Sequence, residues 1–540
     1  MAARISEEDI NPTGSYKTEL DGRENEIAKQ GVFQYTPEPG VQLAVLEPPY
    51  SAFSLRQRRA AVVIVSFVAM ISPLSGSIYL PATSSIARDL DVSDSLIQLT
   101  ITTYQILQGI APSFIGNFSD SHGRRPAYLI CFVIYLAANL GLALQDSYPA
   151  LMILRCLQSA GSSATVAMGS ATVADLVTRA ERGKFIGYAS MGVTLGPALG
   201  PVLGGIFDSY LGWRWIFWFL MIFSVVLLSM YWLFVPETSR SVVGNGSVPP
   251  PRWTMSPAQY IQSRRGDFEN IEAARRTLKQ ARRRPNPFAA LSILLEKEGG
   301  ITLGFGSVMY GGYFMMLTTL SLQLNQRFGF SAVQTGLCYL PLSLGSVASR
   351  WTCGYLLDWN FRRHAKIAGV EIKDNRQQNI DELPIEAIRL QITIPMVYIS
   401  CGTILAYGWT MQFQSSLPGI EISLFFMGLF LSGGLNALNT LVVDTHSESP
   451  ATAVAANNLF RCLVSAGGTA VAVPLIDRIG IGWTSVFISG VWCAFTPLLW
   501  LVYLRGGKWR RDAKEKNEVE EKEKEGQNND NRMEASIQIK

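Results

Sequence analysis

Runs of apolar residues long enough to cross a lipid bilayer recur about twelve times in this chain of 540 residues. A helix needs roughly 20 such residues to span about 30 Å of hydrocarbon, and buried backbone groups in lipid must find their partners within the helix. The sequence therefore predicts an all-α membrane protein with twelve transmembrane helices. We place them near 60–81, 96–116, 127–145, 150–174, 184–206, 214–235, 300–322, 333–357, 391–411, 420–443, 452–475 and 483–504.

The composition supports a membrane protein and excludes an ordinary soluble domain. Hydrophobic residues make up 48% of the chain, charged residues only 16%, and the mean hydropathy is +0.19. A soluble surface on a chain of this size requires more charge. The polar, acidic start lacks the apolar core of a cleavable signal peptide, so we expect none.

The charged connections predict the orientation in the membrane. Lys and Arg concentrate in alternate connections, and cytoplasmic loops carry such an excess. We therefore expect both termini in the cytoplasm. The basic residues of that side are Arg56, Arg58, Arg59, Arg124, Arg125, Arg179, Arg182, Lys184, Arg362, Arg363, Lys366, Arg505, Lys508, Arg510 and Arg511.

An internal repeat predicts two pseudo-symmetric halves. Asp175 and Asp444 each close an apolar run, and they stand as far apart in sequence as Asp208 and Asp477. Parallel repeats of this kind occur in transporters. We expect two six-helix bundles, and we expect the polar tails to lack fixed structure. The predicted parts are a cytoplasmic tail (1–55), the first bundle (56–235), a cytoplasmic linker (236–299), the second bundle (300–505) and a charged cytoplasmic tail (506–540).

A charged motif, Gly116-Asn-Phe-Ser-Asp120-Ser-His-Gly123-Arg124-Arg125-Pro126, stands between two of the apolar runs. Glycines at positions 116 and 123 permit turns with positive φ and close backbone approach. Asp120 and Arg124 can form a charged latch with neighbouring helix ends, which predicts a gate that holds one face shut. The alternative is an ordinary positive-inside turn.

A second motif places glycine at every fourth position of one predicted helix. Such a stripe lets a partner backbone approach closely, and prolines within it remove backbone donors and bend the helix. We interpret the helix as part of a gate, although plain helix packing gives the same pattern. The residues are Gly192, Gly196, Pro197, Gly200, Pro201 and Gly204.

Arg155 is the most informative charge inside a predicted span. It stands roughly 8 Å into its helix at 1.5 Å per residue, and a charge at depth costs on the order of 2.5–3.5 kcal/mol unless it faces a polar interior. Gln158 and Ser162 follow on the same helical face. We expect this face to line a central cavity; the alternative is that Arg155 snorkels to the outer surface.

No Asp, Glu or His occupies the middle of any predicted span. A cationic cargo normally requires a membrane-embedded acid, so we expect an anionic or neutral cargo. The carboxylates left for proton coupling stand at helix ends, namely Asp120, Asp175 and Asp444, and each can instead be a structural ion-pair partner. Arg461 can pair with Asp444 or contact the cargo.

Together these motifs resemble the major facilitator superfamily over residues 56 to 505. The charged motif looks like its signature loop, Arg155 with Gln158 looks like its helix-four motif with Ser159 in place of the usual glycine, and the glycine stripe is similar to the helix-five motif of drug:proton antiporters. Pro236-Glu237-Thr238 fits the fungal twelve-helix branch. Asn457-Asn-Leu-Phe-Arg461 looks like the quinidine-resistance and citrate-exporter subgroup.

The resemblance implies a proton-coupled exporter of the plasma membrane that works by alternating access. We expect cargo contacts from Arg155, Gln158, Ser162, Tyr79, Tyr104 and Gln108. We expect gating or coupling by Gly116, Asp120, Gly123, Arg124, Asp175, Gly192, Gly196, Pro197, Gly200, Pro201, Gly204, Asp444 and Arg461.

The expected cargo is a secondary metabolite or toxic organic compound. A citrate-like organic acid, transport without ion coupling, and a transporter-like sensor remain alternatives. The chain has no phosphate-binding Gly-rich loop with a lysine, and its seven cysteines all fall in predicted spans. The missing loop argues against an ATP-driven pump, and cysteines placed within spans argue against a disulfide framework. With the transporter interpretation, we expect no enzymatic activity, no cofactor and no metal. The expected partners are a small-molecule substrate, protons and the lipid bilayer; we expect no nucleic acid and a monomer.

Overall fold

The fold was analysed in a computed structural model that describes residues 51–246, 248–251, 254–257, 289–367, 369, 384–446 and 450–538. Every regular element assigned in these ranges is helical. The predicted N-terminal tail as far as residue 50 and residues 258–288 of the predicted linker lie outside these ranges.

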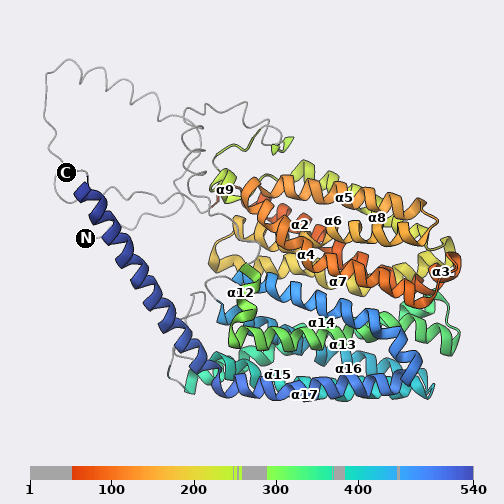
Figure 1. The fold of residues 1–540 in the computed structure, drawn as a ribbon. Coiled ribbons are helices and arrows are strands. Elements are labelled where there is room, and N and C mark those ends of the chain that lie inside the picture. The colour runs from red at the N-terminus through yellow and green to blue at the C-terminus, as the bar shows by residue number, and fades with distance from the viewer. Residues whose placement is uncertain are drawn as a thin grey trace, which may run out of the picture. The chain divides into compact units, whose positions relative to one another are not determined.

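The first half of the chain forms a group of long helices (Figure 1). Pro73, Pro112, Pro197 and Pro201 lie inside these helices without ending them, as is common in membranes. Two short helices join the first pair. The elements are α2 (Leu55–Ile78), η1 (Leu80–Ala82), α3 (Thr83–Asp89), α4 (Asp94–His122), α5 (Arg124–Leu144), α6 (Tyr148–Leu176), α7 (Arg179–Leu211), α8 (Arg214–Phe234) and the short α9 (Arg240–Val243).

The second half repeats this arrangement after the linker. Its last element is interrupted at Gly480, where φ is 79° and ψ is 160°, so α17 consists of two helices joined at a kink. The positive φ explains glycine at this position. The elements are α12 (Ala289–Leu295), α13 (Lys297–Phe328), α14 (Ala332–Ile367), α15 (Ile385–Gln412), α16 (Leu417–Thr445) and α17 (Pro450–Gln538).

Seven segments among the described residues are both long and apolar enough to cross a membrane. The long helices α4, α6, α13 and α14 are not among them, because they carry more polar residues. The lengths and order of the helices agree with the predicted apolar runs. Length and composition together identify seven of the segments as candidate membrane spans. The chain is thus a multi-pass membrane protein, and the predicted all-α fold is confirmed.

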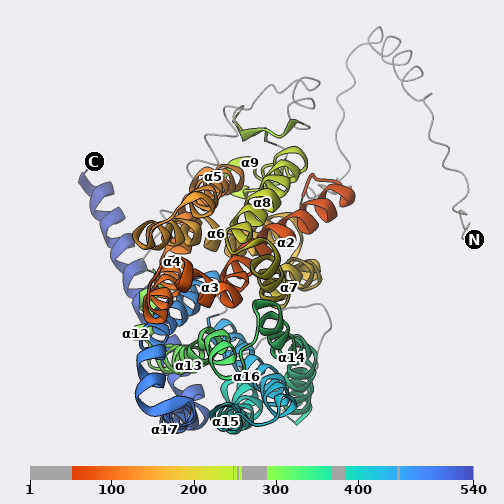
Figure 2. The same ribbon diagram turned by 90° about the vertical axis from the view of Figure 1, so that its right-hand side faces the viewer.

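The two halves contact each other mainly through α4 against α17 and α7 against α14 (Figures 1 and 2). The short helices α3 and α9 lie at opposite ends of the helix array (Figure 1), and we call these ends the α3 end and the α9 end. Hydrogen bonds between described residues of the two halves lie toward the α3 end or near the middle of the helices, as with Gln98 to Thr318 and Val333 to Ser209.

Two expectations about local structure were wrong. Gly116 is part of α4, and only Gly123, with φ of 109°, adopts the turn conformation. The charged tail after 506 is helical as far as Gln538, although its composition indicated no fixed structure. Its many Glu and Lys residues are good helix formers, and the tail continues a helix that is already nucleated.

Candidate functional site

Arg155 lies on α6 and is fully buried, with 0% of its surface exposed. Its guanidinium carbon stands 4.2 Å from the ring centroid of Tyr79 and 4.3 Å from that of Tyr104. Such contacts are worth about 2 kcal/mol when desolvated. Arg155 therefore does not snorkel to the surface.

A chain of hydrogen bonds fixes the far side of the guanidinium. Arg155 Nη1 donates to Gln158 Oε1, and Gln158 Nε2 donates to Asn139 Oδ1 at 2.8 Å. Asn139 Nδ2 in turn donates to the carbonyl of Tyr135 at 2.7 Å. These residues are buried on α5 and α6. Sequence reasoning missed Asn139, which no motif marks.

The α4 side of the site is held by hydroxyl groups. Ser159 Oγ donates to the carbonyl of Tyr104 at 2.6 Å, and the hydroxyls of Tyr104 and Ser162 lie 3.4 Å apart. Tyr79 shares a 3.0 Å hydrogen bond with Thr100. We call Tyr79, Tyr104, Arg155, Gln158 and Ser162 the Arg155 site.

One residue expected beside the Arg155 site faces the other half of the molecule. Gln108 lies one helical turn beyond Tyr104 on α4, and its carbonyl accepts a hydrogen bond from Asn458 Nδ2 at 3.1 Å. The structure therefore brings five of the expected cargo contacts together. It places Gln108 at the junction between the halves.

The charge of Arg155 is unbalanced within the described part of the chain. Its Nε and Nη2 are buried without a hydrogen-bond partner, and no described carboxylate lies within ion-pair distance. Leaving a buried donor unsatisfied costs about 1–3 kcal/mol. A guanidinium with two free donors can bind a carboxylate or another planar anion.

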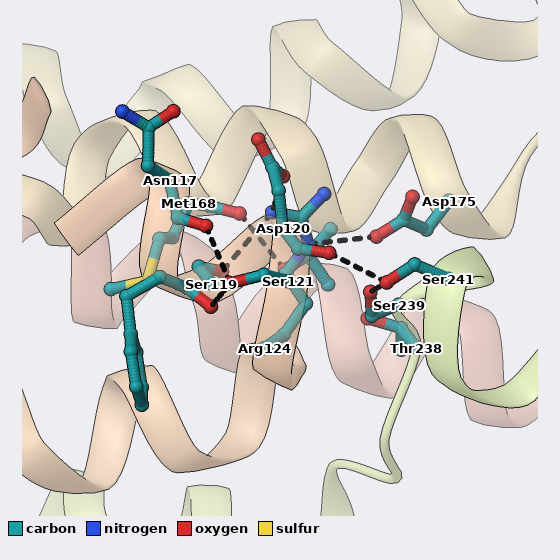
Figure 3. A network of polar contacts seen from close by, with 12 residues as sticks. Asn117, Ser119, Asp120, Ser121, Arg124, Met168, Asp175, Thr238, Ser239 and Ser241 are labelled. Carbon is teal, nitrogen blue, oxygen red and sulfur yellow. Dashed lines mark hydrogen bonds and ion pairs between the residues drawn. The ribbon is translucent and has the colours of Figure 1, made fainter. Parts of the chain in front are cut away.

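The charged motif forms a compact network at the α9 end (Figure 3). Arg124 Nη1 lies 2.5 Å from Asp120 Oδ1, and Arg124 Nε lies 2.9 Å from Asp175 Oδ2 on α6. Ser241 of α9 donates to the carbonyl of Asp120 at 2.6 Å. The latch predicted for these residues is therefore a contact between α4, α5, α6 and α9.

Glu237 completes this network and was not among the expected site residues. It is fully buried, and its Oε1 and Oε2 accept from the backbone N–H groups of Arg124 and Arg125 at 2.8 and 2.9 Å. A carboxylate at a helix N-terminus is favoured by the helix dipole. A Cβ at Gly123 would lie 2.7 Å from Glu237 Oε2, so glycine is also required there by contact. The signal in the sequence was Pro236-Glu237-Thr238. We call Asp120, Arg124, Asp175 and Glu237 the Arg124 latch.

The second half contains a corresponding ion pair. Arg389 Nε on α15 lies 3.0 Å from Asp444 Oδ2 on α16. Asp444 is therefore not the partner of Arg461, which the sequence had left open. Arg461 instead stands over the ring of Tyr310, 4.5 Å from its centroid.

The glycine stripe of α7 packs directly on α2. A Cβ at Gly192 or Gly204 would overlap backbone atoms of Ser66 or Ile78, and a Cβ at Gly196 would lie 2.9 Å from the backbone nitrogen of Leu74. At Gly200 it would meet Ser77 Oγ and lie 2.9 Å from the nitrogen of Ile78. The close approach is thus present, between helices of the same half.

Farther along α7 the contact passes to the other half. A Cβ at Gly205 would overlap the carbonyl of Ala332 on α14, and one at Gly336 would overlap that of Pro201.

A polar cavity of about 310 Å³ lies at this junction of α7 and α14 near the α3 end. Its lining includes Ser85, Arg88, Asp208, Ser321, Asn325 and Ser331. In the described part of the chain no group of His, Cys, Asp or Glu is suited to hold a metal ion.

Comparisons with known proteins agree with this arrangement. The model of the Major Facilitator Superfamily matches residues 65–469. The chain is 46% identical over 466 residues to MFS-type transporter R5 of Phoma sp., covering 86% of this chain and 88% of that protein. It is 43% identical to MFS-type transporter clz19 of Cochliobolus lunatus (95% and 96% covered) and 36% identical to Citrate exporter 1 of Aspergillus niger (88% and 91% covered).

A solved structure gives the same fold at much lower identity. The human organic anion transporter MFSD10 (TETRAN) matches with a TM-score of 0.52 and 18% identity, covering 82% of this chain and 99% of that chain. The family model matches most of the chain, and the alignments with the relatives cover most of both proteins, so the family of this chain is established. The chain belongs to the Major Facilitator Superfamily, among its fungal members, and is a transporter of small molecules rather than an enzyme.

Proposed function

We propose that this transporter exports a small organic compound, anionic or neutral, from the cytoplasm across the plasma membrane, in exchange for protons. The observation that carries the proposal is the Arg155 site. A buried arginine without a described carboxylate partner, held between two tyrosines, suits an anionic or hydrogen-bonding cargo and disfavours a cationic one. A secondary metabolite or toxic compound is the proposed cargo class, and a monomer is the proposed working form.

The distribution of contacts supports an alternating-access cycle. The basic connections cluster at the α9 end, which is the cytoplasmic end by the positive-inside rule. Hydrogen bonds between described residues of the two halves lie toward the opposite end or near the middle, as in Gln98 to Thr318 and Asn458 to Gln108. This pattern corresponds to a state closed toward the outside. Export then requires the halves to separate at the α3 end.

Proton exchange is proposed for the helix-end carboxylates. Asp175 shares Arg124 with Asp120, and Asp444 is bound to Arg389. Protonation of Asp175 or Asp444 removes an ion pair at the end of α6 or α16. It would therefore weaken the contact of that helix end with the neighbouring helix. The alternative is a facilitator whose transport is not coupled to protons.

A citrate-like organic acid is the second candidate cargo. The identity to Citrate exporter 1 extends over most of both chains, and Arg155 suits a carboxylate. The two cargo classes differ in charge and apolar surface.

Transport from preloaded proteoliposomes tests the proposal. Labelled citrate and a labelled aromatic carboxylate, 1-naphthoate, are each loaded with a proton gradient imposed across the membrane. We expect uphill export of at least one anion, abolished by an uncoupler. Unchanged export with the uncoupler would contradict proton coupling, and the absence of export for both anions would contradict the proposed function.

A further inference from the structure

Arg461, like Arg155, lies against an aromatic ring inside the helix array. It lies about 16 Å along α17 from Pro450 at about 1.5 Å per residue. Its guanidinium stacks on Tyr310 of α13, and its Nη2 donates to Asn458 Oδ1 at 3.1 Å. Stacking occupies the face of the guanidinium and leaves much of its edge available for hydrogen bonds.

The charge of Arg461 has no counter-charge among the described residues. No described carboxylate lies within ion-pair distance, since Asp444 is bound to Arg389. The Nε atom is buried without a hydrogen-bond partner. Arginine stays protonated in proteins, so this is a positive charge with at least one buried donor unsatisfied. A ligand carboxylate would satisfy both.

The wall beside Arg461 is aromatic. On α13 the ring of Tyr310 lies 5.2 Å from that of Phe314 and 6.1 Å from that of Tyr313, measured between centroids. All three are only partly buried. An aromatic or apolar body can pack on such rings while its carboxylate reaches the guanidinium. A tricarboxylate offers no such body.

The α4 helix connects Arg461 to the Arg155 site. Asn458, which binds Arg461, also donates to the carbonyl of Gln108, one turn from Tyr104. A Cβ at Gly109 would lie 3.0 Å from that of Cys462, so α4 and α17 are in direct contact here. Arg155 is fully enclosed in this state, whereas Arg461 is only half-buried. The accessible cation is thus on the second half.

We infer that Arg461, Tyr310 and Asn458, the Arg461 cluster, form a second anion-binding site that receives the carboxylate of a cargo with an aromatic body. This inference rests on the proposed function and narrows its cargo class. The carboxylate binds the edge of the Arg461 guanidinium, and the ring packs on Tyr310 and Phe314. Cargo held there lies beside the α4 segment that encloses Arg155.

Equilibrium binding to the purified full-length protein tests this inference. The probes are labelled 1-naphthoate, its uncharged amide 1-naphthamide, and citrate. Wild-type protein should bind naphthoate about tenfold or more tightly than naphthamide, because the amide has no negative charge and only one acceptor oxygen for the guanidinium. Arg461→Ala should weaken naphthoate binding about 10- to 100-fold and leave naphthamide within about twofold.

Further variants separate charge, ring and fold. Arg461→Lys should retain part of the preference for naphthoate, and Tyr310→Leu should weaken naphthoate and naphthamide together. Arg461→Gln keeps amide donors without the charge and replaces Arg461→Ala if the latter is misfolded by its melting temperature. Arg214→Ala, which removes an arginine that pairs with Asp89 and Asp146 at the α3 end, is the matched control and should bind like wild type.

Several outcomes would overturn the inference without touching export. These are equal binding of naphthoate and naphthamide by the wild type, a clear preference for citrate, or full naphthoate affinity in folded Arg461→Gln. Export itself is judged in the vesicle assay, where its absence for every probe contradicts the proposed function whatever the binding result.

Discussion

Arg389 donates from Nε to Asp444 Oδ2 over 3.0 Å, and this ion pair repeats in the second half the one that joins Arg124 to Asp175 at 2.9 Å in the first. Each pair links the start of one helix to the end of the next, α5 to α6 and α15 to α16. The duplication recognised from Asp175 and Asp444 in the sequence is thus also a duplication of contacts. Both pairs lie at the α9 end, opposite the α3 end at which we propose that the halves separate.

Asp120 and Asp175, the two acids that pair with Arg124 in the Arg124 latch, should differ in their effect on stability. The Asp175 side chain is 11% exposed and that of Asp120 is 62% exposed. Asp120→Asn should cost less than about 1 kcal/mol, as for surface ion pairs, whereas Asp175→Asn should cost about 3 kcal/mol, as for a buried pair that loses one partner. Melting temperatures in detergent measure the order. Equal shifts for the two variants would contradict the network described here.

Removal of the Arg155 charge should reduce transport of anionic cargo about tenfold or more. The free Nε and Nη2 donors are the proposed contacts, and a hydrogen bond to a charged group is worth about 1.5–3 kcal/mol. Arg155→Lys keeps the charge but loses the planar fork and should transport at an intermediate rate. The initial efflux rate is measured per unit of protein in the membrane, with Arg214→Ala as control. Wild-type rates in Arg155→Ala would remove this residue from the site.

Alanine at two positions of α7 should have opposite consequences. At Gly200 a Cβ would meet Ser77 Oγ and the Ile78 backbone, whereas at Gly187 nothing lies within 4 Å. Gly200→Ala should destabilise by about 1–3 kcal/mol through overpacking. Gly187→Ala should be neutral or stabilise by up to about 1 kcal/mol, since alanine favours a helix. Melting temperatures and efflux rates check both, and a stable, fully active Gly200→Ala protein would show that α2 and α7 need no such close contact.

Glu298 should make the stability depend on pH. It precedes the apolar run of α13, and burial, followed by the charge of the neighbouring Glu386, raises the pKa of Glu298 to about 8. The unfolded chain releases this proton near pH 4.3, so the folded state binds more protons between these values and stability falls as pH rises from about 4.3 to about 8. Glu298→Gln should flatten that slope in melting curves, and the exposed Glu515→Gln should not. Parallel slopes for wild type and Glu298→Gln would contradict the assignment.

The sequence predicted the fold because apolar run length and charge placement are local properties. It also indicated that Arg155 is buried with Gln158 on one face, since helical spacing determines which residues share a face. Asn139 and Glu237 were missed as site residues because their contacts, with Gln158 and with the start of α5, join different helices. Spacing along the chain carries no information about such pairs. The contact of Gly123 with Glu237, which Gly116 lacks, likewise joins residues far apart in the chain.

Arg461 shows the same limit more clearly. The sequence placed Arg461 inside a predicted span. Whether Arg461 pairs with Asp444 or is left for a cargo depends on the position of Arg389, which the sequence did not show. Competition between two basic residues for one acid is decided by packing of α15 against α16. The aromatic partner, Tyr310, lies on α13, far from Arg461 in the sequence, and no motif marks it.

During each transport cycle the halves should separate at the α3 end, and a reversible cross-link there tests this separation most directly. Ser209 Oγ accepts from the Val333 nitrogen at 3.2 Å, so cysteines at these two positions lie within reach of a short thiol linker. The background carries alanine at Cys156 and Cys493, the two native cysteines that are not buried. We predict that a cleavable cross-link between Ser209→Cys and Val333→Cys stops efflux and that cleavage restores it, while either single variant stays active. Undiminished efflux in the fully cross-linked protein would contradict it.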